Sequence, residues 1–243
     1  MDNAMLIGLS RQLTLRREMD ITANNIANIN TDGFKAERVM LESRETRRAR
    51  HEDGPPQVQF VGEWAMARDF TQGALTSTGR PLDLALDGPG FFVLETQAGD
   101  RFTRDGRFTL NAQGELTASD GARVLDEGGA PIVLDPNAGP VQFGTDGVLI
   151  QNGNPGARLA LAVFEAPGQL SKIGDNRYAA PEDAARLDER PVVRQGFSES
   201  SNVRAILEMS RMMEVSRAYQ SVTRMIRDAD ELSRKAIERL GRP

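Results

Sequence analysis

Apolar residues near the C-terminus recur at alternating spacings of three and four, the pattern of a helix with one narrow hydrophobic seam. The predicted seam runs through Met212, Val215, Tyr219, Val222, Ile226, Ala229, Ser233, Ala236 and Leu240. It extends for about 43 Å at a rise of about 1.5 Å per residue, and Asn202 is the predicted N-cap. A helix with so narrow a seam needs another helix beside it.

A second helix is predicted at the N-terminus, from about residue 3 to residue 29. Its apolar residues fall on two faces, rotated by roughly a quarter turn. The first face carries Met5, Leu9 and Leu13, and the second carries Leu15, Met19 and Ile26. The helix is expected to stop in residues 30–33, where Asp32-Gly33 favours a turn. The two terminal helices either close a single domain as an intramolecular hairpin or assemble with other chains, and long, thinly apolar helices are more typical of assembly.

The middle of the chain follows a different pattern, in which short runs of alternating residues lie between turn residues. Twenty of the 23 glycines and 11 of the 12 prolines lie in residues 51–201, so helices are disfavoured there. Predicted strands cover residues 82–86, 91–95, 101–103, 107–110, 115–117, 123–125, 131–134, 141–143, 148–150 and 159–164, and the chain returns through 178–195. Repeated strand–turn–strand units predict antiparallel hairpins, with a tight hairpin turn at residues 88–90.

These patterns predict an α+β fold, in which long N- and C-terminal helices form a coiled-coil-like layer beside a small, antiparallel, all-β central domain. Residues 1–34 and 202–243 would form the helical domain, and residues 71–201 the β domain. A connector arm, residues 35–70, would join them. The arm is expected to begin helix-like at Glu37–Leu41, to be exposed over the charged residues 44–53, and to break at Gly54-Pro55-Pro56.

Composition excludes most catalytic chemistry. The chain has no cysteine and one histidine, His51, so thiol nucleophiles, cysteine zinc sites and Ser-His-Asp relays have almost nothing to be built from. Gly88-Pro89-Gly90 lacks both the third glycine and the following helix of a dinucleotide-binding loop. A hydrolase with two carboxylates stays possible by composition. We expect no enzyme activity, no catalytic residue, no cofactor and no metal.

The distribution of charge bears on possible partners. The formal net charge is −5, with −10 in residues 51–201 against +2 in residues 1–50 and +3 in residues 202–243. A net acidic chain disfavours duplex nucleic acid as a partner, including in the form of a DNA-binding coiled coil. No apolar run approaches the roughly 20 residues that span a bilayer, and the N-terminus lacks the basic region of a cleavable signal peptide. We expect neither a nucleic-acid partner nor a direct membrane span.

Three motifs, in the right order, resemble the flagellar basal-body rod and hook family. At the N-terminus these are Ala23-Asn24-Asn25-Ile26-Ala27-Asn28 and Thr31-Asp32-Gly33-Phe34-Lys35. In the centre they are residues 81–92 and Phe102-Thr103-Arg104-Asp105-Gly106-Arg107-Phe108. Near the C-terminus they are Ser201-Asn202-Val203 and Ser216-Arg217-Ala218-Tyr219. The opening Met-Asp-Asn-Ala, Arg11-Gln12 and the short connector resemble proximal-rod members more than distal-rod members.

The resemblance implies a structural subunit of the proximal rod, exported through the flagellar type III apparatus without signal cleavage and assembled helically through its terminal helices to transmit torque across the periplasm. Its implied partners are other rod subunits, copies of itself and the export apparatus. The expected subunit-interface residues are Leu9, Leu13, Met19, Asn24, Asn25, Ile26, Asn28, Met213, Tyr219, Val222 and Ile226. The asparagines serve either this interface or only the helix end. The alternatives are a distal-rod subunit and a rod-associated peptidoglycan hydrolase.

Overall fold

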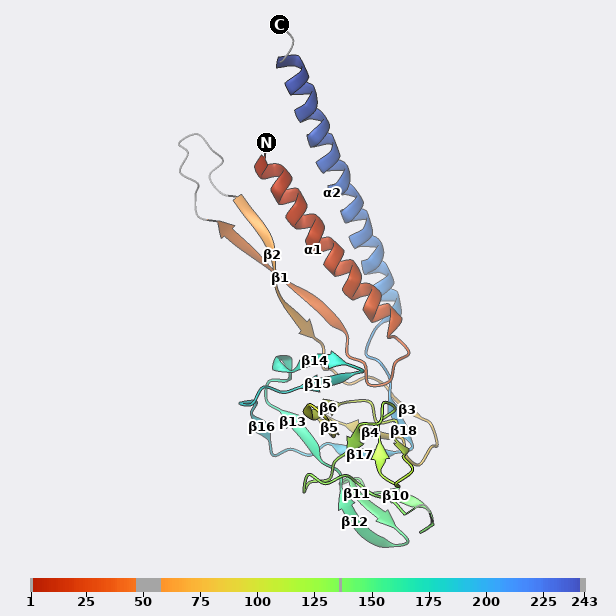
Figure 1. Ribbon diagram of the computed structural model, residues 1–243. Helices are drawn as coiled ribbons and strands as arrows, with labels where there is room; N and C mark the ends of the chain where they lie inside the picture. The colour runs from red at the N-terminus through yellow and green to blue at the C-terminus, as the bar shows by residue number, and fades with distance from the viewer. Residues whose placement is uncertain (1, 47–57, 136, 241–243) are drawn as a thin grey trace. The chain divides into compact units, whose positions relative to one another are not determined.

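The computed structural model describes residues 2–46, 58–135 and 137–240, and the chain divides into two compact units. The helical unit contains Met1–Ala27, Glu37–Asp69 and Arg204–Pro243, and the β unit contains Asn28–Ala36 and Phe70–Val203. Two helices and many antiparallel strands confirm the predicted α+β class (Figure 1). The β unit is large, so its prediction as a small domain was wrong.

Both predicted helices are present, as α1 (Asp2–Ala27) and α2 (Ala205–Leu240). α1 ends two residues before the predicted end because a turn follows, in which the Thr31 N–H bonds to the Asn28 carbonyl at 3.2 Å. α2 begins at Ala205, and Asn202 is not its N-cap. The Asn202 side chain instead accepts a hydrogen bond from the Ala36 N–H at 2.8 Å.

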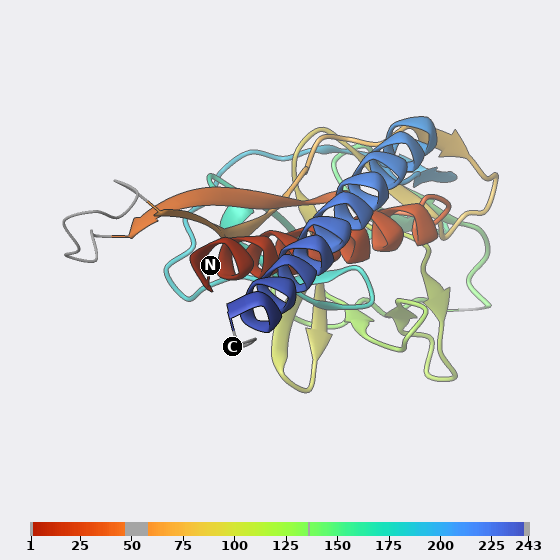
Figure 2. The same ribbon diagram turned by 90° about the horizontal axis from the view of Figure 1, so that it is seen from above.

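The two helices run antiparallel and cross, rather than forming the predicted coiled-coil pair. Figure 2 shows α2 passing over α1, and α1 also contacts the hairpin of β1 (Glu37–Thr46) and β2 (Val58–Arg68). The reason lies in the two apolar faces of α1. Because α1 packs against both α2 and the β1–β2 hairpin, it does not pair with α2 along its whole length. Within the unit, Leu15, Ile21 and Val215 are buried.

The segment predicted to begin helix-like at Glu37–Leu41 is strand β1, so that prediction was wrong. β1 pairs with β2 residue by residue from Glu37–Arg68 to Thr46–Val58, with an irregularity at Met40/Leu41. Long-range pairing, including an Arg68–Glu37 ion pair at 3.1 Å, outweighs local helix propensity here. Of the charged residues 44–53, residues 44–46 belong to β1; residues 47–53, with His51, lie outside the described residues.

The β unit is built from short antiparallel strands. They are β3 (Leu75–Ser77), β4 (Leu84–Asp87), β5 (Phe91–Thr96), β6 (Gly99–Thr103), β7 (Thr109–Leu110), β8 (Leu116–Thr117), β9 (Arg123–Val124), β10 (Val141–Phe143), β11 (Val148–Gln151), β12 (Asn154–Arg158), β13 (Leu161–Phe164), β14 (Ser171–Gly174), β15 (Arg177–Ala179), β16 (Arg186–Leu187), β17 (Val192–Gln195) and β18 (Phe197–Glu199). The main sheet has nine strands and follows the order β14-β15-β6-β5-β9-β8-β7, while β13 pairs with both β5 and β16. A 3₁₀ turn, η1 (Pro167–Gln169), precedes β14.

Strand β5 lies at the centre of the core because both of its faces are buried. Phe92 and Leu94 point into one apolar cluster, and Phe91 and Val93 point into another. The alternation follows from the period of two along a strand. Edge-to-face contacts between aromatic rings, such as Phe92–Phe108 at 5.2 Å between centroids, stabilise both clusters.

Two predicted details of the β unit were wrong. The turn at Gly88–Gly90 does not close a hairpin, because β4 pairs with β17 while β5 pairs with β6, β9 and β13. Residues 131–134 form isolated bridges, Leu125–Pro131 and Glu115–Val133, rather than a strand. Proline at position 131 lacks the N–H donor that a continuous ladder needs.

Within the described part of the chain, no helix is apolar and long enough to span a bilayer.

Candidate assembly surfaces and the junction of the sequence motifs

The N-terminal and central sequence motifs meet inside the β unit, around the carboxylate of Glu199, which lies two residues before the C-terminal motif Ser201-Asn202-Val203. One Glu199 oxygen accepts a hydrogen bond from Lys35 Nζ at 2.6 Å, and the other lies 3.2 Å from Arg104 Nε. The side chains of all three residues are at most 3% exposed. Lys35 Nζ also donates to the Thr71 carbonyl at 2.7 Å. Buried charges of this kind are tolerated only when they are paired and hydrogen-bonded.

The residues beside Lys35 explain the rest of the Thr-Asp-Gly-Phe-Lys motif. Gly33 has φ +69°, and a Cβ added to it would lie 2.4 Å from the Asp105 backbone nitrogen, so only glycine fits. Phe34 is 1% exposed and packs with Ala36 and Val203. Asp32 is 3.0 Å from Arg107, but its burial raises the pKa of this carboxyl more than Arg107 lowers it. The motif therefore serves packing within the chain.

Asn25, which was expected at a subunit interface, lies inside the helical unit. Its side chain is 1% exposed and bonds the Glu37 backbone at both ends, donating to the carbonyl at 2.9 Å and accepting from the N–H at 3.0 Å. It also donates to Glu208 Oε2 at 3.2 Å. A single amide thus joins the end of α1, the start of β1 and the start of α2. Asn24 is exposed and Asn28 is half-buried.

Two residues of the predicted seam, Tyr219 and Ile226, contact α1 of the same chain. Tyr219 Oη accepts a hydrogen bond from Gln12 Nε2 at 3.0 Å, and a Cβ placed on Gly8 would lie 3.0 Å from Ile226 Cγ1. Val222 and Ile226 are half-buried, as are Met19 and Ile26 on α1. These contacts fix the antiparallel register of the two helices.

Six of the 11 large apolar side chains that are exposed in the described part of the helical unit form two stripes. The α1 stripe is Leu6, Leu9 and Leu13, with exposed fractions of 50%, 48% and 61%. The α2 stripe is Ile206, Met209 and Met213, with exposed fractions of 80%, 53% and 55%. Large apolar side chains gathered on one surface typically mark a contact with another molecule.

Of the stripe residues, Leu9, Leu13 and Met213 are among the expected interface residues, whereas Leu6, Ile206 and Met209 are not. The signal was available in the sequence, since Ile206, Met209 and Met213 keep the spacing of one helix face. The predicted seam begins at Met212 and follows a different face of α2, the face that turns toward α1.

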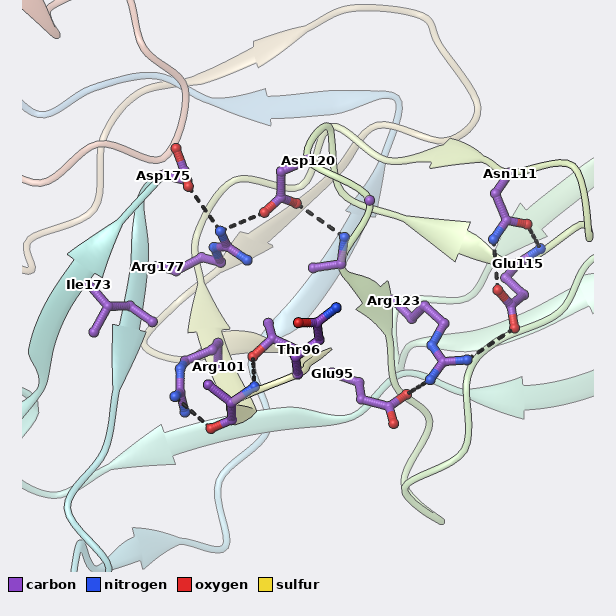
Figure 3. Close-up of a pocket in the computed structure, with 14 residues that line it drawn as sticks. Glu95, Thr96, Arg101, Asn111, Glu115, Asp120, Arg123, Ile173, Asp175 and Arg177 are labelled. Carbon is purple, nitrogen blue, oxygen red and sulfur yellow. Dashed lines mark hydrogen bonds and ion pairs between the residues drawn. The ribbon is translucent and has the colours of Figure 1, made fainter.

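The β unit carries a polar groove of about 920 Å³, lined by residues of β5, β6, β9, β14 and β15 and the turns beside them (Figure 3). Arg123 bridges Glu95 at 2.7 Å and Glu115 at 3.5 Å, while Arg177 bridges Asp120 at 2.7 Å and Asp175 at 2.9 Å. Each carboxylate is thus held by an arginine, so the groove offers paired charges rather than a free acid and base. Among the described residues, no group of three or more His, Cys, Asp or Glu is placed to hold a metal ion.

Comparison with known proteins agrees with the order of the motifs. Residues 5–35 match the family model for flagella basal body rod proteins. Residues 85–151 match the D1 domain of the flagellar hook protein FlgE/F/G, and residues 194–239 match the C-terminal region of the flagellar basal body rod FlgEFG proteins.

Relatives that match along nearly their whole length are named flagellar basal-body rod proteins. The chain is 46% identical to the flagellar basal-body rod protein FlgF of Caulobacter vibrioides, over 100% of this chain and 99% of the relative. The chain belongs to the flagellar basal-body rod protein family. It is also 40% identical to FlgF of Rhizobium meliloti, over 99% of both chains. By contrast, identity to the FlgG protein of Bacillus subtilis is 30%, over 95% of this chain and 96% of the relative.

Family membership settles the class of function. This flagellar basal-body rod protein is a structural component of the flagellum and not an enzyme, so the alternative of a peptidoglycan hydrolase is set aside. Within the family, FlgF fits better than FlgG, in agreement with the proximal-type features of the sequence. The chain is placed in the flagellar basal body, among other rod subunits.

Proposed function

We propose that this rod protein is a subunit of the proximal part of the rod, which assembles helically with copies of itself and with other rod subunits through its terminal helices. The exposed apolar stripes of the helical unit carry the proposal, because they lack a cover within the described chain. Copies added side by side would bury these stripes, and the helices of neighbouring copies would then pack against one another.

The division of roles among the expected interface residues follows from their exposure. Leu9, Leu13 and Met213 are the ones that reach a neighbour, together with the other residues of both stripes. Tyr219 and Ile226 hold α1 and α2 together, and Asn25 fixes the helix ends. Val222, Met19 and Ile26 are half-buried. The half-buried Asn28 and the exposed Asn24 stay candidates for contacts at the base of α1.

The mechanical role needs many contacts of moderate strength rather than one tight site. A rod that transmits torque across the periplasm distributes its load over helix contacts that recur between successive subunits around the tube. Export through the flagellar type III apparatus without a cleaved signal is part of the same proposal. A helical unit that becomes complete only on assembly suits a chain that must pass through the export apparatus before it joins the rod.

Substitution of Leu9 by aspartate tests the proposal. In a strain that lacks its own copy of the gene, we expect the parent chain to restore swimming and Leu9→Asp to abolish it, because a charge would be buried at the subunit contact. The melting temperature of the purified variant should stay within about 1–2 °C of the parent, since Leu9 is exposed in the free chain. Gln113→Asp, an exposed position of the β unit, is the matched control and should swim normally. Full swimming by Leu9→Asp would contradict the proposal.

A further inference from the structure

We propose that the α1 stripe of one copy packs antiparallel on the α2 stripe of the next copy, with the two copies staggered along the helix axes by about 21 Å, at about 1.5 Å per residue. This inference rests on the proposed function, which requires contacts between copies, and it names the surfaces and the geometry of one such contact.

The spacing of the two stripes is the first argument. Leu6, Leu9 and Leu13 stand at positions i, i+3 and i+7 of α1, and the residues of the α2 stripe, Ile206, Met209 and Met213, have the same spacing. An antiparallel pairing sets Leu6 opposite Met213 and Leu13 opposite Ile206, with Leu9 beside Met209. Two exposed rows of equal length therefore cover each other along their whole extent.

The register within one chain prevents the two stripes from meeting each other. Gly8 lies against Ile226, Gln12 against Tyr219, and Asn25 against Glu208. On this register Leu9 is level with a residue near position 224 of α2, whereas Met209 is level with one near position 24 of α1. The stripes are thus separated by about 14 residues, or about 21 Å, along the helical unit. A second copy displaced by that distance brings its α1 stripe level with this α2 stripe.

The displacement preserves the direction of every copy. α1 and α2 are antiparallel within one chain, so α1 of a shifted, unflipped copy is also antiparallel to the α2 it meets. Two different surfaces come together, which makes the contact heterologous, and a heterologous contact repeated with an axial shift gives an open helical series. This is the symmetry that a rod needs.

Charge favours the antiparallel over the parallel pairing. Arg16 and Arg17 follow the α1 stripe on the same face, and Arg217 follows the α2 stripe; all three are exposed. A parallel pairing would place these arginines level with each other, whereas the antiparallel one places Arg16 and Arg17 beyond the start of α2. Like charges at a contact are unfavourable.

The size of the contact explains why it would form only in an assembly. Six aliphatic side chains of roughly 100 Å² each bury about 600 Å², while stable pairs of proteins bury about 1,200–2,000 Å². A single stripe contact leaves the free chain monomeric. Several such contacts, made at once by a subunit entering the rod, add up to a stable position.

Engineered disulfides test the pairing, since the natural chain has no cysteine. The antiparallel contact predicts cross-links between copies in Leu13→Cys/Ile206→Cys and in Leu6→Cys/Met213→Cys, after oxidation of basal bodies isolated from a strain that carries only the variant. The parallel contact would instead cross-link Leu6→Cys/Ile206→Cys and Leu13→Cys/Met213→Cys. Leu13→Cys/Gln113→Cys, with its second cysteine on the β unit, is the control for chance collisions.

We expect at least about tenfold more reducible dimer and higher ladder from the antiparallel pairs than from the control, since neighbouring cysteines held in contact have an effective concentration of about millimolar. Disulfides within one chain cannot form in these variants, because a disulfide requires Cα atoms within about 7 Å. The two stripes of one chain are about 21 Å apart along the helical unit. Swimming of each variant under reducing conditions reports on the proposed function separately. Swimming cells whose basal bodies give only parallel cross-links, only links to another rod protein, or none above control would overturn the inference alone. A parent chain absent from basal bodies would overturn the proposed function.

Discussion

The β unit buries most of its large apolar side chains, whereas the helical unit buries few of its own and leaves many exposed. Among the described residues, three of the 30 buried apolar side chains belong to the helical unit, but that unit holds 11 of the 15 large apolar side chains that are exposed. The β unit also buries its charges in pairs, as Glu199 does with Lys35 and Arg104. The contrast indicates that the β unit is complete as a single chain, whereas the helical unit is completed by other molecules.

The largest effect on stability is expected at Glu199. In Glu199→Gln, the buried cations of Lys35 and Arg104 lose their shared anion, and the free energy of unfolding of the β unit should fall by about 3–5 kcal/mol. Urea titration followed by the NMR signals of amides in the β unit measures it. Glu182→Gln, an exposed glutamate, should stay within about 0.5 kcal/mol of the parent. Equal stability of the two variants would mean that the charge cluster does not hold the β unit together.

A glycine pair of equal φ separates backbone strain from close contact. Gly33 has φ +69° and Gly79 has φ +68°, but a Cβ meets the Asp105 backbone at Gly33 and nothing within 4 Å at Gly79. Gly79→Ala should cost about 1–2 kcal/mol for the left-handed backbone alone. Gly33→Ala should cost about 1–3 kcal/mol more, since the backbone must also shift. Thermal unfolding of both variants gives the difference, and equal losses would contradict the tight approach at Gly33.

Asn25 tests whether the helical unit has any fixed internal structure before assembly. Asn25→Ala leaves the Glu37 N–H and carbonyl and one Glu208 oxygen without this partner, which should cost about 2–3 kcal/mol locally. Amide hydrogen exchange at Glu37 should accelerate by about 30–150-fold. Asn24→Ala, at the exposed neighbour, is the control and should leave that rate unchanged. Rapid exchange at Glu37 in the parent would show that the junction opens in the free chain.

The smallest effect concerns Asp83 in the β unit. Burial by itself would raise the pKa of Asp83, but hydrogen bonds from Arg80 and Thr78 and the charges of Arg80 and Arg107 hold it below its ordinary value of 3.8. Because the unfolded chain then binds the proton more readily, the stabilisation is complete above that value and is lost as the pH falls through the lower, folded-state pKa.

The Asp83→Asn variant should therefore be about 1 kcal/mol less stable than the parent at neutral pH, and the difference should shrink in strongly acidic solution. Chemical denaturation of both chains at neutral pH and well below the ordinary pKa measures it. A difference that stays constant or grows in acid would give the wrong sign for a lowered pKa.

Sequence reasoning predicted what depends on local periodicity. The spacing of Met5, Leu9 and Leu13 predicts α1, and the alternation around Phe91 and Phe92 predicts β5. It missed what depends on distant partners. Burial of Lys35 needs Glu199, 164 positions away, and a lone lysine in a motif reads as a surface residue. The local sequence of Glu37–Leu41 favours a helix, and only its pairing with residues 63–68 makes it a strand.

The candidate surfaces divide in the same way. Periodicity identified which helices carry unpaired apolar residues, but only the register of α1 on α2 separates Tyr219 and Ile226, which face inward, from Met213, which faces out. For Asn25, the sequence left open a subunit interface and a role at the helix end alone. Its hydrogen-bond partners within the chain lie on β1 and α2, which no local pattern brings together.

Solvent access to the α1 stripe, measured in the free chain and in the rod, tests most directly that neighbours complete the helical unit. A single cysteine in place of Leu13, which is 61% exposed, can be labelled with a maleimide in the purified chain and in isolated basal bodies. We expect rapid labelling of the free chain and at least about a hundredfold slower labelling in the rod, the protection typical of a buried contact. Equal labelling rates in the two samples would contradict the completion of this surface by neighbouring subunits.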